Sequence, residues 1–372
     1  MTTIDDRTTT YTSVALADIR AAARAVLDPQ VWDFVEGGSG TESTLAANRT
    51  AFTELTVTPR VLTGVTAADT TARLVGTEAA MPVAVAPMAY QRLLHEEGEL
   101  AAARAARASG VPYVVSTLSS HRLEDIAATG ADTWFQLYCL RDPARNHELI
   151  RRAEDAGCRA LMVTVDVPLM ARRPRDVRNG FALPAHVQAA NLATGPGTEA
   201  HRRVDGASAL AVHTDAAFAP GLTWRDLESL RRRTTLPLVV KGVLDPRDAR
   251  AAVDIGADAV VVSSHGGRQS DGAPPSMRAL PAVAQAVSGD CEILLDSGVR
   301  SGLDVLKALA LGAHGVLLGR PVLWGLAAHG EDGVAAVLSL LHTELAEAMT
   351  LAGCAGPAAA AALRTERPGT RV

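Results

Sequence analysis

The segment SSHGGRQ, residues 263–269, carries a histidine and an arginine three positions apart, with two glycines between them. A histidine titrates near neutral pH and can remove a proton as a general base. An arginine can bind a carboxylate through two parallel hydrogen bonds, and glycines permit a sharp turn or a close approach to a flat ligand. His265 and Arg268 are therefore candidates for acid–base chemistry on an anionic substrate. The competing interpretation is a polar glycine turn without a catalytic role.

Charged residues also follow two other apolar runs. Asp166 ends one run, and Arg173 lies in an arginine cluster a few residues later. Clustered arginines suit an anionic ligand, and Asp166 could stabilise a protonated histidine. The solvated start of a helix is the alternative for the cluster. Lys241 ends the other run. A buried lysine needs a partner, so it suits a site where negative charge develops, unless its ammonium group reaches the surface.

Two later segments each pair a glycine with an arginine. Asp296, Gly298 and Arg300 lie in the first segment, and Gly319 and Arg320 lie in the second. Backbone N–H groups at a glycine turn or a helix start bind phosphate, and the loops after the seventh and eighth strands of a TIM barrel often do so. These residues are predicted to hold a phosphate group rather than to form ordinary turns.

Gln136 and Tyr138 are two positions apart at the end of another apolar run. Side chains two apart on a strand share one face. Both are therefore predicted to face a ligand.

These candidates follow eight short apolar runs that alternate with amphipathic, alanine-rich segments. Apolar strands that alternate with helices indicate a parallel sheet buried on both faces. Eight such units in about 250 residues fit an α/β fold of the (β/α)8 TIM-barrel type better than an open sheet, and the carboxyl ends of its strands would bring the candidates together. The runs are 82–87, 113–116, 133–138, 160–166, 237–241, 259–264, 292–296 and 315–318, and the clearest helical segments are 99–109, 145–156, 245–255 and 302–311.

We expect a single domain over residues 1–372, with three parts outside the repeat. Residues 1–80 would form an N-terminal helical cap that begins with a helix over 16–35, and residues 81–332 would form the barrel. Residues 182–221 form a long insertion after the fourth strand, which is typical of a lid. Residues 333–372 would form one or two helices and a loose tail.

Composition argues against several classes of protein. The net charge of −5 disfavours a nucleic-acid partner, which needs a strongly basic surface. The N-terminus lacks the apolar core of a secretory signal, and no apolar stretch reaches the ~20 residues of a membrane span. The four cysteines and ten histidines are scattered, so no metal site is predicted, and free thiols favour the cytoplasm. A Rossmann GxGxxG motif and a P-loop are both absent.

As a set, these segments resemble the FMN-dependent 2-hydroxy-acid oxidising family, which includes glycolate oxidase, lactate oxidase, mandelate dehydrogenase and hydroxymandelate oxidase. The resemblance covers nearly the whole chain and implies a TIM barrel that binds FMN. It also suggests a tetramer. The motifs that carry it, in order, are VWDFVEGGSGTESTLAANRTAF, MPVAVAPMAYQRLLHEEGEL, WFQLY, LMVTVDVP, RRPRDVRNGF, LVVKGV, VVVSSHGGRQSDGAP, DSGVRSGLDVLKALALGA and LLGRPVLWGLA.

The resemblance also implies which residues contact FMN. Lys241 would lie beside the flavin N1–C2 carbonyl, where negative charge accumulates on reduction. The other implied flavin contacts are Pro87, Ala89, Ser116, Gln136, Thr164 and Ser263, and the implied ribityl and phosphate contacts are Asp296, Gly298, Arg300, Gly319 and Arg320.

For the substrate, the resemblance implies that Arg173 and Arg268 bind the carboxylate and that Tyr138 lies near the hydroxyl or carboxylate. His265 would be the base, and Asp166 would stabilise its protonated form. The implied reaction converts an (S)-2-hydroxy acid to a 2-oxo acid. Electron transfer as a carbanion or as a hydride stays open.

Four positions depart from the commoner family pattern. Phe34 stands where many members have Tyr, Leu118 where glycolate oxidases have Trp, Ser270 where Leu is usual, and Ser297 where Gly is usual. Phe34 removes a hydrogen bond and makes the pocket more apolar, and with Met88, Tyr90 and Leu118 nearby we infer room for an aromatic side chain. Together with the segments WDF, RNGFALPAH and AANL, which resemble actinomycete hydroxymandelate oxidases, these residues imply mandelate or 4-hydroxymandelate as the substrate.

Ala89 favours O2 as the electron acceptor, with H2O2 as product, because dehydrogenases of the family tend to have glycine there. A quinone- or carrier-coupled dehydrogenase and a lactate-type monooxygenase are the alternatives on the same scaffold. A barrel that binds FMN or a phosphorylated ligand without turnover is the alternative from another class.

Overall fold

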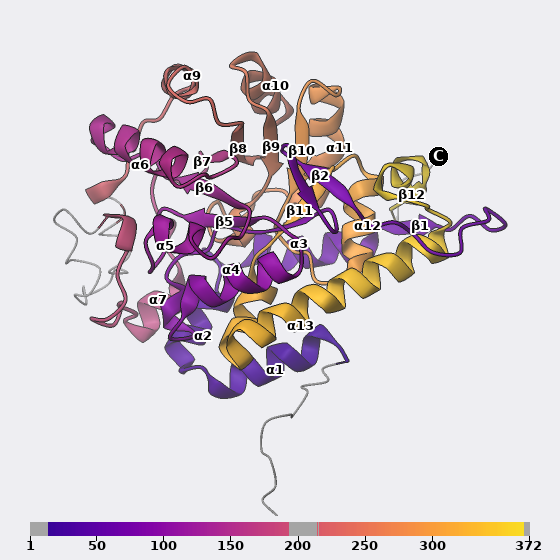
Figure 1. Ribbon diagram of the computed structural model, residues 1–372, viewed down its shortest axis with the longest axis horizontal. Helices are drawn as coiled ribbons and strands as arrows, with labels where there is room; N and C mark the ends of the chain where they lie inside the picture. Colours follow the sequence, from indigo (N-terminus) through magenta and orange to yellow (C-terminus); the bar gives the residue numbers. More distant parts are fainter. Residues whose placement is uncertain (1–13, 193–213, 215, 368–372) are drawn as a thin grey trace, which may run out of the picture.

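The computed structural model describes residues 14–192, 214 and 216–367 (Figure 1). Eight parallel strands close into a barrel in chain order, which confirms the predicted (β/α)8 class. All but one lie within the predicted apolar runs, and β8 extends two residues further. The strands are β4 (Val83–Val85), β5 (Tyr113–Ser116), β6 (Thr133–Leu137), β7 (Leu161–Thr164), β8 (Leu238–Val243), β9 (Ala259–Val262), β10 (Glu292–Leu295) and β11 (Gly315–Leu318).

Burial on both faces explains why these strands are continuous apolar runs. Trp134, Met162 and Val239 pack together inside the barrel. Their chain neighbours, such as Phe135 and Val163, belong to the outer cluster that faces the helices. A charged side chain on either face would lose its hydration, so the polar residues come at or after the ends of the strands.

Helices connect the strands around the outside of the barrel. The four helical segments predicted from the sequence match α4, α6, α10 and α12 to within two residues at each end. Asp142 and Asp245 cap the starts of α6 and α10 by accepting a backbone hydrogen bond, and a proline follows each of them. The surrounding helices are α4 (Gly98–Ala108), α5 (Leu123–Ala127), α6 (Pro143–Asp155), α9 (Trp224–Arg231), α10 (Pro246–Asp254), α11 (Ser276–Val287) and α12 (Gly302–Ala310).

The N-terminal segment differs from the prediction in two respects. The expected helix over 16–35 is two helices, α1 (Leu16–Val26) and α2 (Pro29–Glu36). Asp28 starts α2 by accepting a hydrogen bond from Gln30 N at 2.8 Å, with Pro29 at the first helical position. The segment is also not wholly helical, because α3 (Ser43–Glu54) is followed by the strands β1 (Thr56–Thr58), β2 (Ala72–Leu74) and β3 (Thr77–Ala79).

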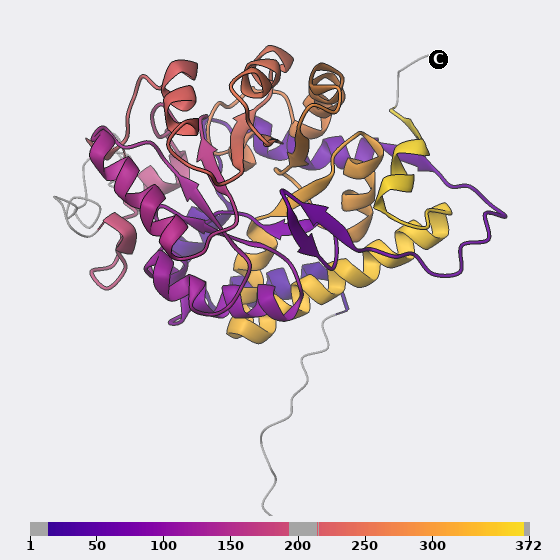
Figure 2. The same cartoon turned by 45° about the horizontal axis from the view of Figure 1, so that its top comes forward.

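The β2–β3 hairpin contributes to the interior of the barrel (Figure 2). Leu74 and Val75 belong to the same cluster as the inward-facing strand residues. The Trp134 indole Nε1 donates to Thr77 Oγ1 at 3.1 Å. The hairpin therefore fills one end of the barrel with side chains.

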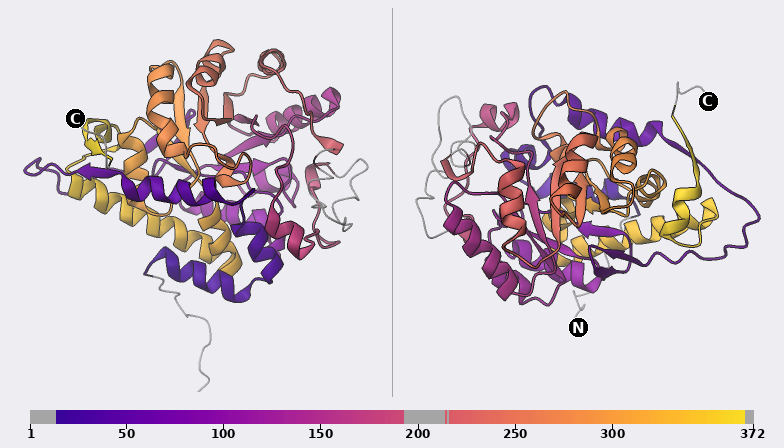
Figure 3. Two further views of the ribbon diagram at one scale, coloured as in Figure 1. Left: turned by 180° about the vertical axis from the view of Figure 1, so that it is seen from behind. Right: turned by 90° about the horizontal axis from the view of Figure 1, so that it is seen from above.

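The C-terminal part contains more regular secondary structure than the sequence predicts. Helix α13 (Arg320–Ala352) starts directly after β11 and bends at His329 and Gly330, so the predicted boundary at residue 333 falls inside it. It packs against α1, α4 and α12 (Figure 3). On length and composition alone, α13 would be long and apolar enough to cross a membrane.

The predicted loose tail contains regular structure as far as residue 366. A 3-10 turn, η5 (Pro357–Ala362), is followed by β12 (Arg364–Glu366), which pairs antiparallel with β1 at the edge of the molecule away from α6. The insertion predicted over 182–221 lies largely outside the described residues. Its described parts include η2 (Ala190–Leu192) and a bridge from Phe218 to Leu140.

Candidate active site

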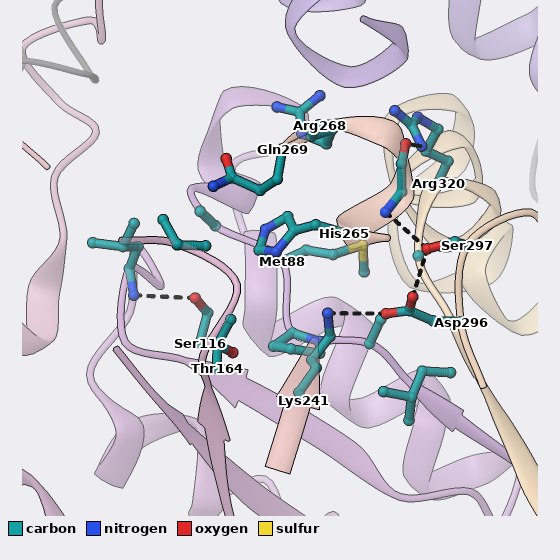
Figure 4. Close-up of a pocket in the computed structure, with 18 of the residues that line it drawn as sticks. Met88, Ser116, Thr164, Lys241, His265, Arg268, Gln269, Asp296, Ser297 and Arg320 are labelled. Carbon is teal, nitrogen blue, oxygen red and sulfur yellow. Dashed lines mark hydrogen bonds and ion pairs between the residues drawn. The ribbon is translucent and has the colours of Figure 1, made fainter. Parts of the chain in front are cut away.

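The carboxyl ends of the barrel strands surround a cavity that α2 and the strand-following loops complete (Figure 4). Asp166, Gln136 and Ser263 lie behind its lining, and each is hydrogen-bonded to a lining side chain. The structure thus brings together residues spread over most of the chain. The predicted residues that line the cavity are Phe34, Pro87, Ala89, Ser116, Leu118, Tyr138, Thr164, Arg173, Lys241, His265, Arg268, Asp296, Gly298, Arg300, Gly319 and Arg320.

The His265 ring lies between a carboxylate and a phenol. Its Nδ1 is 3.0 Å from Asp166 Oδ1, and its Nε2 is 3.4 Å from Tyr138 Oη. Burial acts to raise the pKa of Asp166, but the charge and hydrogen bond of His265 and the charge of Lys241 outweigh it, so the pKa lies below its ordinary value. An ionised Asp166 favours a proton on Nδ1. Nε2 is then the nitrogen that can accept a proton from a ligand.

A left-handed turn presents this ring. His265, Gly266 and Gly267 form the short helix η4 (His265–Gly267), with φ angles of 54°, 66° and 73°. A Cβ on Gly267 would lie 2.6 Å from Leu45 Cα, so only glycine fits against α3. Ser39 N donates to Gly267 O at 3.0 Å and fastens the turn to the N-terminal segment.

Gln269 and Asp271, which the sequence did not single out, hold the surrounding loops. Gln269 Nε2 donates to the carbonyls of Asp166 and Leu169, each at 2.9 Å, and so fixes the loop after β7. The Asp271 carboxylate accepts hydrogen bonds from Thr41, Ser43 and Thr44 at the start of α3. A Gln or Asp in a polar loop carries no periodic signal that would reveal such a role.

Two arginines face the cavity close to His265. Arg268 Nη1 donates to the carbonyls of Phe34 and Gly37 at 2.7 and 2.9 Å, and its guanidinium lies 5.1 Å from the Phe34 ring centroid. Arg173 is buried, and its Nε has no hydrogen-bond partner among the described residues. Burial lowers the pKa of Arg173 to about 9, and the Arg268 charge acts in the same direction. Both guanidiniums therefore favour an anion between them.

Asp176 lies close enough to Arg173 and Arg268 for their charges to act on it. Its carboxylate is buried, and neither oxygen has a hydrogen-bond partner among the residues described. Burial raises its pKa, while the two arginines oppose that shift. Asp176 escaped prediction from the sequence, because an Asp in a charged helix start usually indicates a solvated residue.

Lys241 is buried at the end of β8 and paired with an acid. Its Nζ lies 3.0 Å from Asp296 Oδ2 and donates to Ser263 Oγ at 3.1 Å. Burial acts to lower the pKa of Lys241, but the charges of Asp296 and Asp166 raise it above its ordinary value. The lysine thus stays cationic, and the surface-directed alternative is wrong, because the side chain is only 6% exposed.

Polar side chains on neighbouring strands complete the floor of the cavity. Gln136 Nε2 donates to Thr164 Oγ1 at 3.1 Å, and its Oε1 accepts from Ser116 Oγ at 3.2 Å. Gln136 and Tyr138 were both predicted to face a ligand, but only Tyr138 lines the cavity. Gln136 lies behind the lining and is hydrogen-bonded to Thr164, which does line it.

The loops after β10 and β11 present two arginines to the cavity. Arg320 donates to the carbonyls of Val35, Gly266 and Gly37 at 2.9 to 3.0 Å. Burial lowers the pKa of Arg320 to about 9, and burial lowers that of Arg300 to about 10. In the described part of the chain, neither guanidinium has a carboxylate within 4.0 Å. Gly298 has a φ of 118°, and a Cβ there would meet Asn48 O at 2.8 Å.

Comparison with known proteins assigns the family. A sequence model described as FMN-dependent dehydrogenase matches residues 23–364. The chain belongs to this family. It is 58% identical over 355 residues to 4-hydroxymandelate oxidase of Amycolatopsis orientalis, with 95% of this chain and 99% of the relative covered. It is 45% identical over 346 residues to L-lactate oxidase of Nostoc sp., with 92% and 94% covered.

A solved structure of mandelate oxidase with (S)-4-hydroxymandelic acid matches the chain with a TM-score of 0.93 and 57% identity. The match covers 95% of this chain and 99% of that chain. A second structure of mandelate oxidase has a TM-score of 0.90 and 55% identity, with 96% and 99% covered. The likeness therefore extends through the barrel and its N-terminal and C-terminal helices.

As a member of the FMN-dependent dehydrogenase family, the protein uses FMN, and the cavity fits this cofactor. Among the described residues, the guanidiniums of Arg300 and Arg320 have no carboxylate within 4.0 Å, so both can bind a phosphate group. Gly298 and Gly319 let the backbone come close to a ligand. The buried Lys241 supplies a cation on the floor of the cavity, which would balance the negative charge of a reduced flavin.

Part of the cavity lining is apolar and includes residues that were not assigned from the sequence. Phe34 stacks on Phe181 with centroids 4.7 Å apart, and Tyr138 stacks on Phe218 at the same distance. Val167, Met170, Thr214 and Phe218 also line the cavity. Thr214 and Phe218 return from the far end of the insertion, where no repeat pattern marks a position as cavity-facing.

Proposed function

We propose that the protein oxidises an (S)-2-hydroxy acid of the mandelate class, mandelate or 4-hydroxymandelate, to the 2-oxo acid, with O2 reduced to H2O2. The observation that carries this proposal is the set formed by His265, Asp166, Arg173 and Arg268 at one cavity. It places a base beside two cations that suit a carboxylate. The relatives named hydroxymandelate, mandelate and lactate oxidase support the same class of reaction.

The two arginines bind the substrate carboxylate. Arg173 has an unpartnered Nε, and Arg268 is oriented by its bonds to two backbone carbonyls. Burial raises the pKa of Tyr138 to about 12, so its hydroxyl stays protonated and can donate to the substrate. Three donors then fix the orientation of the 2-hydroxy acid relative to His265.

His265 accepts the substrate proton at Nε2. Asp166 binds the proton on Nδ1 and stabilises the imidazolium that forms. Bound FMN supplies a two-electron acceptor, which the substrate reduces and O2 reoxidises. Asp296, Gly298, Arg300, Gly319 and Arg320 would hold its ribityl and phosphate groups, and Lys241 would balance charge beside the ring.

The apolar lining of the cavity favours an aryl substituent. Phe34, Leu118 and Met170 are among the apolar side chains that line it. Burying a phenyl ring among these side chains is favourable, whereas a glycolate hydrogen or a lactate methyl would leave much of this surface without contacts. Phe34 lacks the hydroxyl of the tyrosine that many family members have, so the pocket wall itself donates no hydrogen bond there.

Anaerobic spectroscopy tests this function. The purified protein should be yellow and should bleach on addition of (S)-mandelate, with a higher kcat/KM than for lactate or glycolate. Replacement His265→Gln should keep the colour and abolish the bleaching. A clear preference for lactate or glycolate would contradict the substrate, and bleaching by the variant would contradict the base.

The electron acceptor needs its own measurement. Mixing the reduced protein with O2 should restore the yellow spectrum rapidly, with one H2O2 formed per 2-oxo acid. Slow reoxidation would favour a quinone- or carrier-coupled dehydrogenase, and loss of CO2 with oxygen insertion would favour a monooxygenase. The free cysteines favour a cytoplasmic location. The resemblance suggests a tetramer, which light scattering would test as four times the mass of one chain.

A further inference from the structure

Ser297, the second residue after β10, has a backbone conformation that L-residues rarely adopt. Its φ is 74°, and its side chain is buried. Glycine reaches this left-handed region without steric cost, whereas a Cβ is strained there. A serine at this place therefore needs a compensating interaction through its hydroxyl.

The Ser297 hydroxyl uses its full hydrogen-bonding capacity. It donates to Asp296 Oδ1 at 2.6 Å (Figure 4). It accepts from the backbone N–H groups of Gly266 and Ser264 at 2.9 and 3.2 Å. A hydroxyl has one donor and two acceptor sites. One side chain thus joins the loop after β10 to the turn that carries His265.

These bonds close a ring of contacts around the floor of the cavity. Asp296 pairs with Lys241 at 3.0 Å, and Lys241 donates to Ser263 Oγ at 3.1 Å. Ser263 Oγ in turn accepts from the backbone N–H of His265 at 3.0 Å. The ring links the cation on the floor to the turn that presents His265.

We propose that Ser297 is a positioning residue for the proposed oxidation, whose hydroxyl holds the His265 turn and the Asp296–Lys241 pair in one fixed arrangement. This inference rests on the proposed function. Without the hydroxyl, the Asp296 carboxylate loses a donated hydrogen bond, so its negative charge offsets more of the Lys241 charge. The site then stabilises a negatively charged reduced flavin less well. The backbone N–H groups of Ser264 and Gly266 also lose their acceptor.

Two substitutions separate the hydroxyl from the backbone strain. Ser297→Gly removes the hydroxyl and relieves the strain, and Ser297→Ala removes the hydroxyl but keeps the strain. Ser288 provides the matched control, because it also has a left-handed φ, of 51°, but ends α11 with an exposed side chain. Ser288→Gly therefore relieves similar strain outside the ring of contacts.

The first readout is the midpoint potential of the bound flavin, measured by chemical reduction against reference dyes. We expect both Ser297 variants to lower the equilibrium constant for flavin reduction about tenfold, which is about 30 mV for a two-electron couple. The second readout is the rate of flavin reduction at saturating (S)-mandelate, which should fall in both variants while the KM changes little, since Arg173 and Arg268 are outside the ring. Ser288→Gly should leave both quantities unchanged.

The proposal would be overturned if Ser297→Gly kept the wild-type midpoint potential and rate of flavin reduction. It would also be overturned if the glycine and alanine variants differed in midpoint potential, because the backbone conformation would then be responsible. If Ser297→Ala does not fold, Ser297→Gly decides alone. Failure of every 2-hydroxy acid to reduce the wild-type flavin would contradict the proposed function instead, and the chemically measured potentials would still test the role of Ser297.

Discussion

Asp166 Oδ1 lies 3.0 Å from Nδ1 of His265, while Nε2 of the same ring lies 3.4 Å from the Tyr138 hydroxyl. The two nitrogens therefore have different surroundings, one facing an ionised carboxylate and the other facing the cavity. Under the proposed function, this difference gives Nδ1 a holding role and Nε2 a proton-accepting role.

Asp166→Asn tests this assignment. An amide cannot stabilise the imidazolium as a carboxylate does, so the rate of flavin reduction by substrate should fall about 10²- to 10⁴-fold, the range that acid–base groups contribute. Stopped-flow absorbance measures this rate, and the flavin content and the affinity for a 2-oxo acid should change little. An unchanged rate would show that Asp166 does not act on His265.

Arg173→Lys tests the binding of the carboxylate. Lysine keeps the positive charge but cannot form two parallel hydrogen bonds, so the KM for (S)-mandelate should rise roughly 10- to 100-fold. The neighbouring Arg172 is exposed, and Arg172→Lys is the matched control. Equal effects of the two substitutions would argue against a specific contact between Arg173 and the substrate.

Gly298→Ala tests the FMN site. The φ of 118° and the 2.8 Å approach of a Cβ to Asn48 O would force the loop to move. We expect the Kd for FMN, measured by titrating the apoprotein, to rise about tenfold or more, which is about 1.4 kcal/mol. Gly256→Ala is the control, because its φ is 82° but no atom lies within 4 Å of the added Cβ. Tight binding by the Gly298 variant would refute the close-approach argument.

The Glu124–Arg152 pair predicts a pH dependence of stability. Two hydrogen bonds, of 2.7 and 3.0 Å, join the side chains. The hydrogen bond to Arg152 is the largest influence and lowers the pKa of Glu124 from 4.5 to about 2. Because the folded-state value is the lower one, the stabilisation is present above pH 4.5 and is lost as the pH falls toward 2.

Glu124→Gln should therefore lower the free energy of unfolding by about 1 kcal/mol at pH 7, a modest value because solvent screens a carboxylate that is partly exposed. Urea denaturation at pH 7 and pH 3 measures the difference, which should shrink at pH 3. A difference independent of pH would assign the effect to packing rather than to charge.

Local patterns were sufficient to predict the barrel, and chemistry at the strand ends selected Tyr138, Lys241 and His265. The family resemblance was needed for the other lining residues Phe34, Pro87, Ala89, Ser116, Leu118 and Thr164. The barrel pattern and the polar residues at the strand ends can both be identified from short stretches of sequence, because a buried strand must be apolar until it ends. The sequence also contains a signal for the start of α2, namely Asp28 followed by Pro29. The apolar periodicity continues across this signal and therefore favoured a single helix.

The features that escaped prediction depend on contacts between distant segments. The pairing of β12 with β1 joins residues 364–366 to residues 56–58. Phe218 stacks on Tyr138 from the far end of the insertion, and Asp176 is buried beside arginines despite its charged neighbours. None of these relationships has a period or a motif that a single sequence would display.

The hairpin that fills one end of the barrel also affects the order of events in turnover. With Trp134 and Leu74 packed inside, the described part of the chain leaves the loop face as the side from which a hydroxy acid reaches the cavity. Under the proposed function, the substrate and the 2-oxo acid then use the same face of the barrel and compete for Arg173 and Arg268. Departure of the product is consequently a step that the next substrate cannot bypass, and it can set the pace of the whole cycle.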